Sequence, residues 1–190
     1  MRELAALRAV PEVVLHKLQD VPFDMAKFLE TNNFPGHDGR HCVRPETFAR
    51  FYLHEYLPGV DRVLYLDTDT IIRADVGPLY LTRMEHAIAA VPQEKPLARY
   101  LEKLSVRQRL PHDFCNEDMY FFNAGVLLLD LRRWRPGSLT QSLEQWVQLM
   151  SGVDGDQMAL NLEFRNSHDH LDWRWNAETL GYNPWRVPEP

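Results

Sequence analysis

Residues 63–72 read VLYLDTDTII, an apolar, strand-like run that carries two carboxylates one residue apart. The stretch Arg62–Leu66 shows no alternation with polar residues, which suits a strand in a sheet that is covered on both faces. In a strand, residues i and i+2 project to the same face. Asp67 and Asp69 therefore point together if the extended geometry continues past Leu66.

Two carboxylates on one face repel each other unless a positive group lies between them. Ligands of open α/β sheets gather beyond the carboxyl ends of the strands, and hard carboxylate oxygens favour Mg²⁺ or Mn²⁺. We therefore expect Asp67 and Asp69 to hold Mn²⁺ or Mg²⁺ that bridges to the phosphates of a ligand. The alternative from the residues alone is that both aspartates cap the following turn, with Asp75 also turn-like.

Composition points to an ordinary globular protein. The 190 residues, 45% hydrophobic and 25% charged, suffice for one domain with a core, so we treat residues 1–190 as a single domain. The formal net charge of -6 argues against attraction to nucleic acid or an anionic membrane. Cys42 and Cys115 are too few for a cysteine-rich scaffold or a cysteine zinc site. No charge-free apolar run reaches about 18 residues, so we expect no membrane segment in this chain.

Helix and strand signals alternate along the chain, which predicts an α/β sheet. Phe48, Tyr52 and Tyr56 recur at four-residue spacing in a helix that begins at Pro45. Strands are expected at Val13–Leu18, Arg62–Leu66 and Tyr120–Leu131, the last with a turn at Asn123–Gly125. Helices are expected at residues 2–9, 45–57, 97–110, 138–150 and 157–164.

Further signals concern the helix ends and one weakly patterned segment. Ser138 and Gln141 fit a capping box for the helix at 138–150. Asp156 fits the N-cap of the helix that follows it. The segment Thr82–Asn116 holds several prolines around its helical pattern, and we expect it to be a mobile or substrate-facing insertion.

Four segments stand in a distinctive order, namely FARFYLHEYLPGVDRVLYLDTDTIIRADVGPLY (48–80), FNAGVLLLDLRRWR (122–135), DGDQMALN (154–161) and WRWNAETLGYNPW (173–185). Through them the sequence from Arg44 to Trp185 closely resembles glycosyltransferase family 8, the retaining, metal-dependent enzymes that include glycogenin-like and lipopolysaccharide galactosyltransferases. The resemblance implies a GT-A-type nucleotide-diphospho-sugar transferase fold, a Rossmann-like mixed sheet flanked by helices. It also implies transfer of a hexose or related sugar from a UDP-sugar to a hydroxyl of a carbohydrate, lipid-linked or protein acceptor.

The same resemblance implies roles for the residues of the donor site. Asp69 would bind the metal directly, and Asp67 would meet both the metal and the nucleotide ribose. Arg50 would contact the donor, although from the residues alone a structural ion pair is the alternative. Asn123 and Ala124 would line the sugar pocket, for which a plain turn or bulge at Gly125 is the alternative.

The catalytic pair implied by the resemblance is Asp156 and Gln157. Asp156 would help to hold the sugar, a role that is compatible with capping a helix, and Gln157 would lie beneath the anomeric carbon. An amide is a poor nucleophile, so we expect Gln157 to stabilise the oxocarbenium-like centre rather than to attack it. Trp175 and Asn176 match a further family feature, which we assign mainly to packing.

The chain departs from the family at both ends. Members usually begin with a strand that holds the nucleotide base, and they end with a His-x-x-Gly-x-x-Lys-Pro-Trp element that completes the metal site. Neither is found ahead of Val13–Leu18 or after Gly181, so we expect an incomplete fold. His168 and His170 are expected to face solvent rather than to replace the missing ligand. Relatives work in the Golgi lumen in eukaryotes and in the cytoplasm in bacteria, which leaves the compartment open.

Two other classes of protein stay in view. One is a catalytically inactive glycosyltransferase-like binding module or fragment, which the missing end elements favour and the intact aspartate pair opposes. The other is a haloacid-dehalogenase-type phosphatase with Asp67 as nucleophile and Asp69 as acid/base. That phosphatase family expects Thr or Val in place of Ile71 and a later Gly-Asp-Gly-x-x-Asp, which this sequence lacks.

Overall fold

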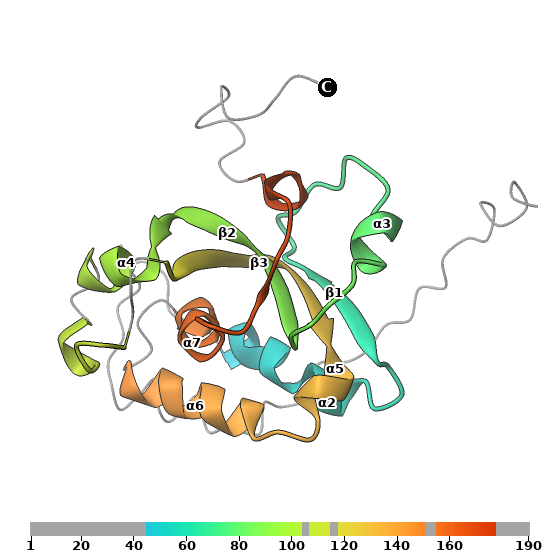
Figure 1. The fold of residues 1–190 in the computed structure, drawn as a ribbon. Coiled ribbons are helices and arrows are strands. Elements are labelled where there is room, and N and C mark those ends of the chain that lie inside the picture. The colour runs from blue at the N-terminus through green and yellow to red at the C-terminus, as the bar shows by residue number, and fades with distance from the viewer. Residues whose placement is uncertain (1–44, 104–106, 115–117, 151–154, 178–190) are drawn as a thin grey trace, which may run out of the picture.

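The computed structural model describes residues 45–103, 107–114, 118–150 and 155–177 (Figure 1). Its helical segments are η2 (Pro45–Tyr52), α2 (Leu53–Tyr56), α3 (Gly77–Tyr80), α4 (Leu97–Lys103), η3 (Arg107–Arg109), α5 (Leu131–Trp134), α6 (Leu139–Leu149), α7 (Gly155–Glu163) and η4 (Trp173–Asn176). Its strands are β1 (Arg62–Leu66), β2 (Ile88–Pro96), β3 (Tyr120–Asp130) and β4 (Asp169–His170). The predicted strand Val13–Leu18, the helix at 2–9, Cys42, Cys115 and Gly181 lie outside the described residues.

The described strands form one mixed sheet in the order β1-β3-β2-β4. The strand β3 pairs antiparallel with both β1 and β2, and β2 pairs parallel with β4. Figure 1 shows α6, α7 and η2 below the sheet in that view and η4 above it. This arrangement confirms the predicted mixed α/β sheet flanked by helices.

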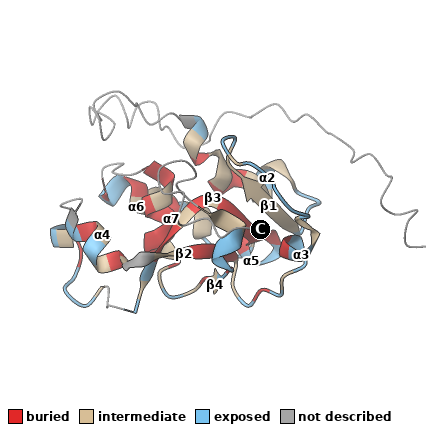
Figure 2. Cartoon of the chain, turned by 90° about the horizontal axis from the view of Figure 1, so that it is seen from above, coloured by how far each residue is buried: buried red, intermediate tan, exposed pale blue. Residues whose placement is uncertain are grey.

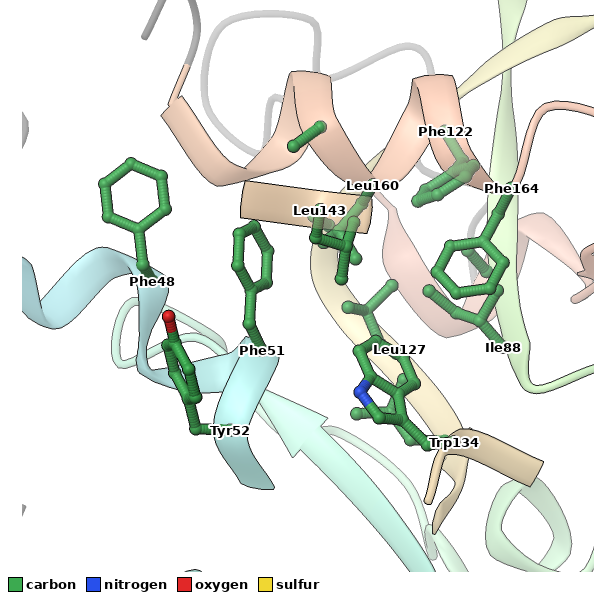
Figure 3. Close-up of a cluster of buried hydrophobic side chains, with 14 of the residues drawn as sticks. Phe48, Phe51, Tyr52, Ile88, Phe122, Leu127, Trp134, Leu143, Leu160 and Phe164 are labelled. Atoms are coloured by element: carbon green, nitrogen blue, oxygen red, sulfur yellow. The ribbon is translucent and has the colours of Figure 1, made fainter. Parts of the chain in front are cut away.

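Side chains of β3 alternate between hydrophobic clusters on the two faces of the sheet. The helix-side cluster, part of which Figure 3 shows, includes Phe48, Phe51, Ile88, Leu127, Leu129, Trp134, Leu143 and Leu160. The opposite-face cluster comprises Leu79, Met84, Ala89, Val91, Val126, Leu128 and Leu171. Because both faces are covered, β3 is the most deeply buried strand, which Figure 2 shows largely in red.

The strand β1 has the predicted bounds, and its side chains reach both clusters. Val63 and Tyr65 pack on the helix side, whereas Leu64 and Leu66 pack on the opposite face. All five residues are nevertheless only partly buried, because β1 is an edge strand of the described sheet. The apolar run of β1 therefore reflects packing against the clusters on both faces of the sheet, and not a position in the middle of the sheet.

The expectation that Thr82–Asn116 is a mobile or substrate-facing insertion is wrong for its middle part. The strand β2 lies there, and it pairs inside the sheet between β3 and β4. Its prolines argue against a central strand in sequence reasoning. Here Pro92 and Pro96 lie where the register with β3 shifts, so their missing N–H groups do not interrupt a regular ladder. Where a helix is predicted at 97–110, the structure describes α4 up to Lys103 and the 3₁₀-helix η3, with residues 104–106 between them outside the described residues.

Several details of the helices differ from the sequence expectation. Residues 45–52 form a 3₁₀-helix, whose three-residue period buries Phe48 and Phe51 together, so the four-residue pattern missed Phe51. Ser138 stands at the N-cap of α6 without a side-chain capping bond, so the capping box is not formed. Leu143 and Val147 of α6 and Met150 at its C-cap lie at three- to four-residue spacing and are buried, so they form an apolar stripe on this helix. None of the helices in the described part of the chain is long and apolar enough to cross a membrane.

Candidate functional site

The backbone turns immediately after β1. Asp67 donates its N–H to Gly125 O on β3 at 2.8 Å, and its carbonyl accepts the N–H of Thr70 at 3.0 Å. The turn from Asp67 to Thr70 means that extended geometry does not continue to Asp69, so the condition under which the two side chains would point together is not met. Asp69 lies in the turn and is exposed to solvent.

The carboxylate of Asp67 faces the protein through one oxygen. Its Oδ1 accepts hydrogen bonds from the Tyr65 hydroxyl at 2.8 Å and from Arg50 Nη2 at 3.0 Å. The Asp67 side chain therefore does not cap the turn. Asp75 does cap its turn, because its Oδ1 accepts the N–H of Gly77 at 2.8 Å.

Arg50 connects segments that are far apart in the sequence. Its Nη1 donates to Ala124 O at 2.6 Å, and its Nε lies 2.6 Å from Asp156 Oδ2 as an ion pair rather than an aligned hydrogen bond. The guanidinium also lies 4.3 Å from the centre of the Tyr65 ring, a cation–π contact. The Arg50 side chain is only 9% exposed. The ion-pair alternative is thus present, and the pair is buried.

Asp156 lies in the first turn of α7, which begins at Gly155, so it is not the N-cap that the sequence suggested. It is buried, and burial raises its pKa to about 6, against the opposing effect of the Arg50 cation. The nearby negative charge of Asp67 raises the pKa further. A single arginine therefore serves two carboxylates, which leaves the cluster net negative once Asp156 is ionised.

The first half of β3 has backbone groups that neighbouring strands do not pair. The predicted turn at Asn123–Gly125 is absent, since β3 runs through it, but the register with β2 shifts there. Gln157 Oε1 accepts the N–H of Ala124 at 2.8 Å. Asn161 accepts the N–H of Phe122 at 2.7 Å and donates to its carbonyl at 2.8 Å. Side chains of α7 thus satisfy this part of β3.

Asn123 forms hydrogen bonds within β3 and with η4. Its Oδ1 accepts the N–H of Gly125 at 2.7 Å and Nδ2 of Asn176 at 2.9 Å. Asn176, assigned mainly to packing, therefore reaches the site from η4. Trp175 does pack, against the opposite-face cluster.

Sequence reasoning also passed over Tyr65 and Asn161. For Tyr65 the available signal is its two-residue spacing from Asp67 within a strand. Burial is the main cause that raises the pKa of the Tyr65 hydroxyl, so this hydroxyl stays a protonated donor at neutral pH. For Asn161 the signal is a polar residue on the apolar side of the helix that follows Gln157.

The nearby histidines behave differently from the expectation. His168 is buried and lies 2.9 Å from Phe164 O through Nδ1, so the prediction that it faces solvent is wrong. Burial lowers its pKa, which keeps the ring neutral. His170 is exposed as expected.

The described residues suit a divalent cation that is only partly held by protein. Gly125 leaves room beside Asp67, because a Cβ at that position would lie 3.2 Å from Asp67 Oδ2. Among the residues that the structure describes, no group of three or more His, Cys, Asp or Glu side chains could hold a metal. Mg²⁺ is usually bound by one or two carboxylates together with phosphates and water. Asp67 fits such a site through its Oδ2, and the exposed Asp69 lies on the turn that follows it.

Comparisons with known proteins identify the family of this chain. The family model for "Glycosyl transferase family 8" matches residues 8–189. Glycosyltransferase 8 domain-containing protein 1 from Xenopus laevis is 34% identical over 167 residues, which cover 75% of this chain and 46% of that protein. The probable galacturonosyltransferase-like 9 of Arabidopsis thaliana is 32% identical over 146 residues, 72% of this chain and 37% of its own length. The chain thus spans less than half of these curated relatives.

Solved structures show the same fold. The galactosyltransferase LgtC, in complex with donor and acceptor sugar analogs, superposes with a TM-score of 0.60 at 26% identity over 78% of this chain and 50% of its own. Mouse xyloside xylosyltransferase 1 has a TM-score of 0.60 at 22% identity over 97% of this chain and 72% of its own, and supports the fold alone. The fold is therefore of the GT-A type, and the phosphatase alternative is set aside. By the match that runs from residue 8 to residue 189, this chain belongs to glycosyltransferase family 8.

Proposed function

We propose that the chain binds a UDP-sugar with Mn²⁺ or Mg²⁺ and transfers the sugar, with retention of configuration, to an acceptor hydroxyl. The observation that carries the proposal is the connection made by Arg50. It joins Asp67 at the end of β1, Ala124 on β3 and Asp156 on α7. These are the segments whose residues the family resemblance assigns to the metal, the sugar pocket and the sugar. We further propose that residues 1–190 act as one domain.

The charge of the cluster supports a cationic partner. Arg50 lies between the carboxylates of Asp67 and Asp156, and Asp69 adds an exposed negative charge on the following turn. A divalent cation would offset the excess negative charge and at the same time attract the diphosphate. When bound, the metal supplies Lewis acidity that neutralises charge on the departing diphosphate.

Transfer breaks the bond between the anomeric carbon and the diphosphate oxygen, and the electron pair leaves with UDP. The acceptor oxygen forms the new bond, and its proton passes to the departing diphosphate. In this scheme Asp156 accepts hydrogen bonds from sugar hydroxyls, and its attachment to Arg50 fixes where it does so. Gln157 Oε1 accepts the N–H of Ala124, and its second lone pair can face the oxocarbenium-like anomeric carbon of the donor. Gln157 therefore lines the site rather than attacking the sugar.

The choice of sugar and acceptor is proposed at the level of chemical class. The names of the relatives include galacturonosyltransferase-like proteins and a galactosyltransferase solved with donor and acceptor sugar analogs. We propose a hexose or a related hexuronic sugar as the group transferred. The acceptor class is a carbohydrate, lipid-linked or protein hydroxyl.

Calorimetric titration of UDP into the chain tests the proposal, first with Mn²⁺ and then with a chelator. We expect binding that requires the metal and that is abolished by Asp69→Asn. The matched control is Asp75→Asn, which alters an exposed turn carboxylate outside the Arg50 cluster and should leave binding unchanged. A well-folded chain that binds no UDP with Mn²⁺ would overturn the catalytic proposal and favour the inactive binding module.

A further inference from the structure

Tyr65 and Asp67 form a pair at the end of β1. They are two residues apart at the point where the strand gives way to the turn, and the Tyr65 hydroxyl reaches Asp67 Oδ1 at 2.8 Å. Arg50 donates to the same oxygen at 3.0 Å while its guanidinium lies over the Tyr65 ring. The tyrosine therefore contacts both members of the Arg50–Asp67 ion pair.

These contacts distinguish the two oxygens of Asp67. Oδ1 accepts both a hydroxyl and a guanidinium hydrogen bond, whereas Oδ2 lies on the side where Gly125 has no side chain. A carboxylate that is held through one oxygen cannot rotate freely, so its other oxygen keeps a fixed direction. Hydrogen-bond partners of metal ligands orient those ligands in this way, and removing such a partner typically lowers metal affinity 10- to 100-fold.

We propose that Tyr65 is a positioning residue for the metal site: it fixes the Asp67 carboxylate so that Oδ2 is the oxygen presented to Mn²⁺. The inference rests on the proposed function, because it presupposes that Asp67 is a metal ligand. It goes beyond that function by assigning a role to a residue that does not itself touch the metal or the sugar.

The ring and the hydroxyl of Tyr65 have separable tasks. The ring packs against the helix-side cluster and beneath Arg50, and phenylalanine would keep both contacts. Only the hydrogen bond to Asp67 would be lost. Tyr65→Phe should therefore keep the fold and change the direction in which the Asp67 carboxylate is held.

The test is the affinity for Mn²⁺, measured by electron paramagnetic resonance of free Mn²⁺ in the presence of UDP. We expect Tyr65→Phe to raise the Kd for Mn²⁺ about tenfold. Sugar-transfer or UDP-sugar hydrolysis activity should return towards the wild-type kcat when Mn²⁺ is raised to saturation. A tyrosine that merely supports the fold would show no such rescue by metal.

Tyr80→Phe is the matched control. The Tyr80 hydroxyl donates to Arg62 O at 3.3 Å, and its ring lies 6.0 Å from the Arg62 guanidinium, which reproduces the tyrosine–arginine arrangement away from Asp67. This variant should bind Mn²⁺ like the wild type. If it weakens binding as much as Tyr65→Phe does, the assignment to Tyr65 is overturned.

The remaining outcomes separate this inference from the proposed function. If the wild type binds no Mn²⁺ with UDP, the proposed function fails, and the inference fails with it. If the wild type binds Mn²⁺ and Tyr65→Phe binds it equally well, only the role of Tyr65 is refuted. A Tyr65→Phe protein without a cooperative thermal transition would show that the hydroxyl is needed for folding, which also contradicts the positioning role.

Discussion

At the scale of single residues, Arg50 organises the candidate site because its planar guanidinium has donors on several sides. The sequence resemblance placed Arg50, Asp67, Ala124, Asp156 and Gln157 in one site, and the structure brings them together. It does not join Asp69 to this cluster within the described residues, since the strand ends before it. The partners of Arg50 could not be read from sequence, because they depend on how η2 packs against β3 and α7.

Removing the Arg50 side chain should destabilise the fold. Arg50→Ala would leave Asp156 buried without its cation, and breaking a buried ion pair costs about 3 to 5 kcal/mol. We expect urea unfolding to report a loss of that order. Arg174→Ala provides the comparison, because its pair with Asp172 is exposed and such pairs contribute little to stability. Equal losses for the two variants would show that the Arg50 pair is not buried in solution.

The raised pKa of Asp156 predicts a specific pH dependence of stability. Its pKa is about 6 in the folded state and about 3.9 when unfolded, so between these values the folded protein holds the extra proton. The contribution of Asp156 to the unfolding free energy therefore falls as pH rises from about 4 to about 6, by at most about 3 kcal/mol.

Asp156→Asn removes this titration and isolates the effect from that of other groups. The difference in unfolding free energy between wild type and variant, measured by denaturant titration at several pH values, should fall across that window and be level above about pH 7. A difference that stays level or rises between pH 4 and 6 would show that the pKa is not raised.

At the scale of elements, the helices and strands lie where the sequence predicts them when the local hydrophobic pattern is strong. The uninterrupted apolar run of β1 and the stripe of α6 are strong patterns, and both elements are where they were expected. The strand β2 was missed because Pro92 and Pro96 are unfavourable in a central strand. The sequence does not show that both prolines lie where the register between β2 and β3 shifts. The N-cap expected at Asp156 was wrong because α7 begins at Gly155, two residues before the expected start at Gln157. The Asp156 carboxylate is instead buried in an ion pair with Arg50.

The contact between β3 and the turn after β1 predicts that Gly125 is essential to the site. A Cβ on residue 125 would lie 2.9 Å from Asn123 Oδ1 and 3.2 Å from Asp67 Oδ2. We expect Gly125→Ala to weaken Mn²⁺-dependent UDP binding in calorimetry, because both side chains must move. Gly59→Ala is the control, since nothing lies within 4 Å of a Cβ there. Wild-type affinity in Gly125→Ala would mean that Asp67 Oδ2 need not face residue 125.

The attachment of α7 to β3 is tested at Asn161. Asn161→Ala would leave the buried N–H and carbonyl of Phe122 without this partner, and each unsatisfied group costs about 1 to 3 kcal/mol. We expect a corresponding loss in urea unfolding, and faster hydrogen exchange in β3. Asn166→Ala, at an exposed position after α7, should be close to neutral. An Asn161→Ala protein as stable as the control would show that water replaces the amide.

At the scale of the whole molecule, the site forms where segments distant in sequence meet at the carboxyl end of β1. The carboxyl end of β1, the middle of β3, the first turn of α7 and the helix η2 each contribute, and both hydrophobic clusters hold these elements in place. The order of sequence motifs could indicate the family and the sheet. It could not indicate which groups touch, because that depends on packing between elements.

The most direct test of this account is a crystal structure of the chain with Mn²⁺ and UDP, with the metal located by its anomalous scattering. We predict a single metal site beside Asp67 Oδ2, on the Gly125 side, with that oxygen coordinated directly to the metal. Asp67 Oδ1 should still be held by Tyr65 and Arg50. An anomalous peak away from Asp67 and Asp69, or UDP bound with no metal beside them, would contradict the account.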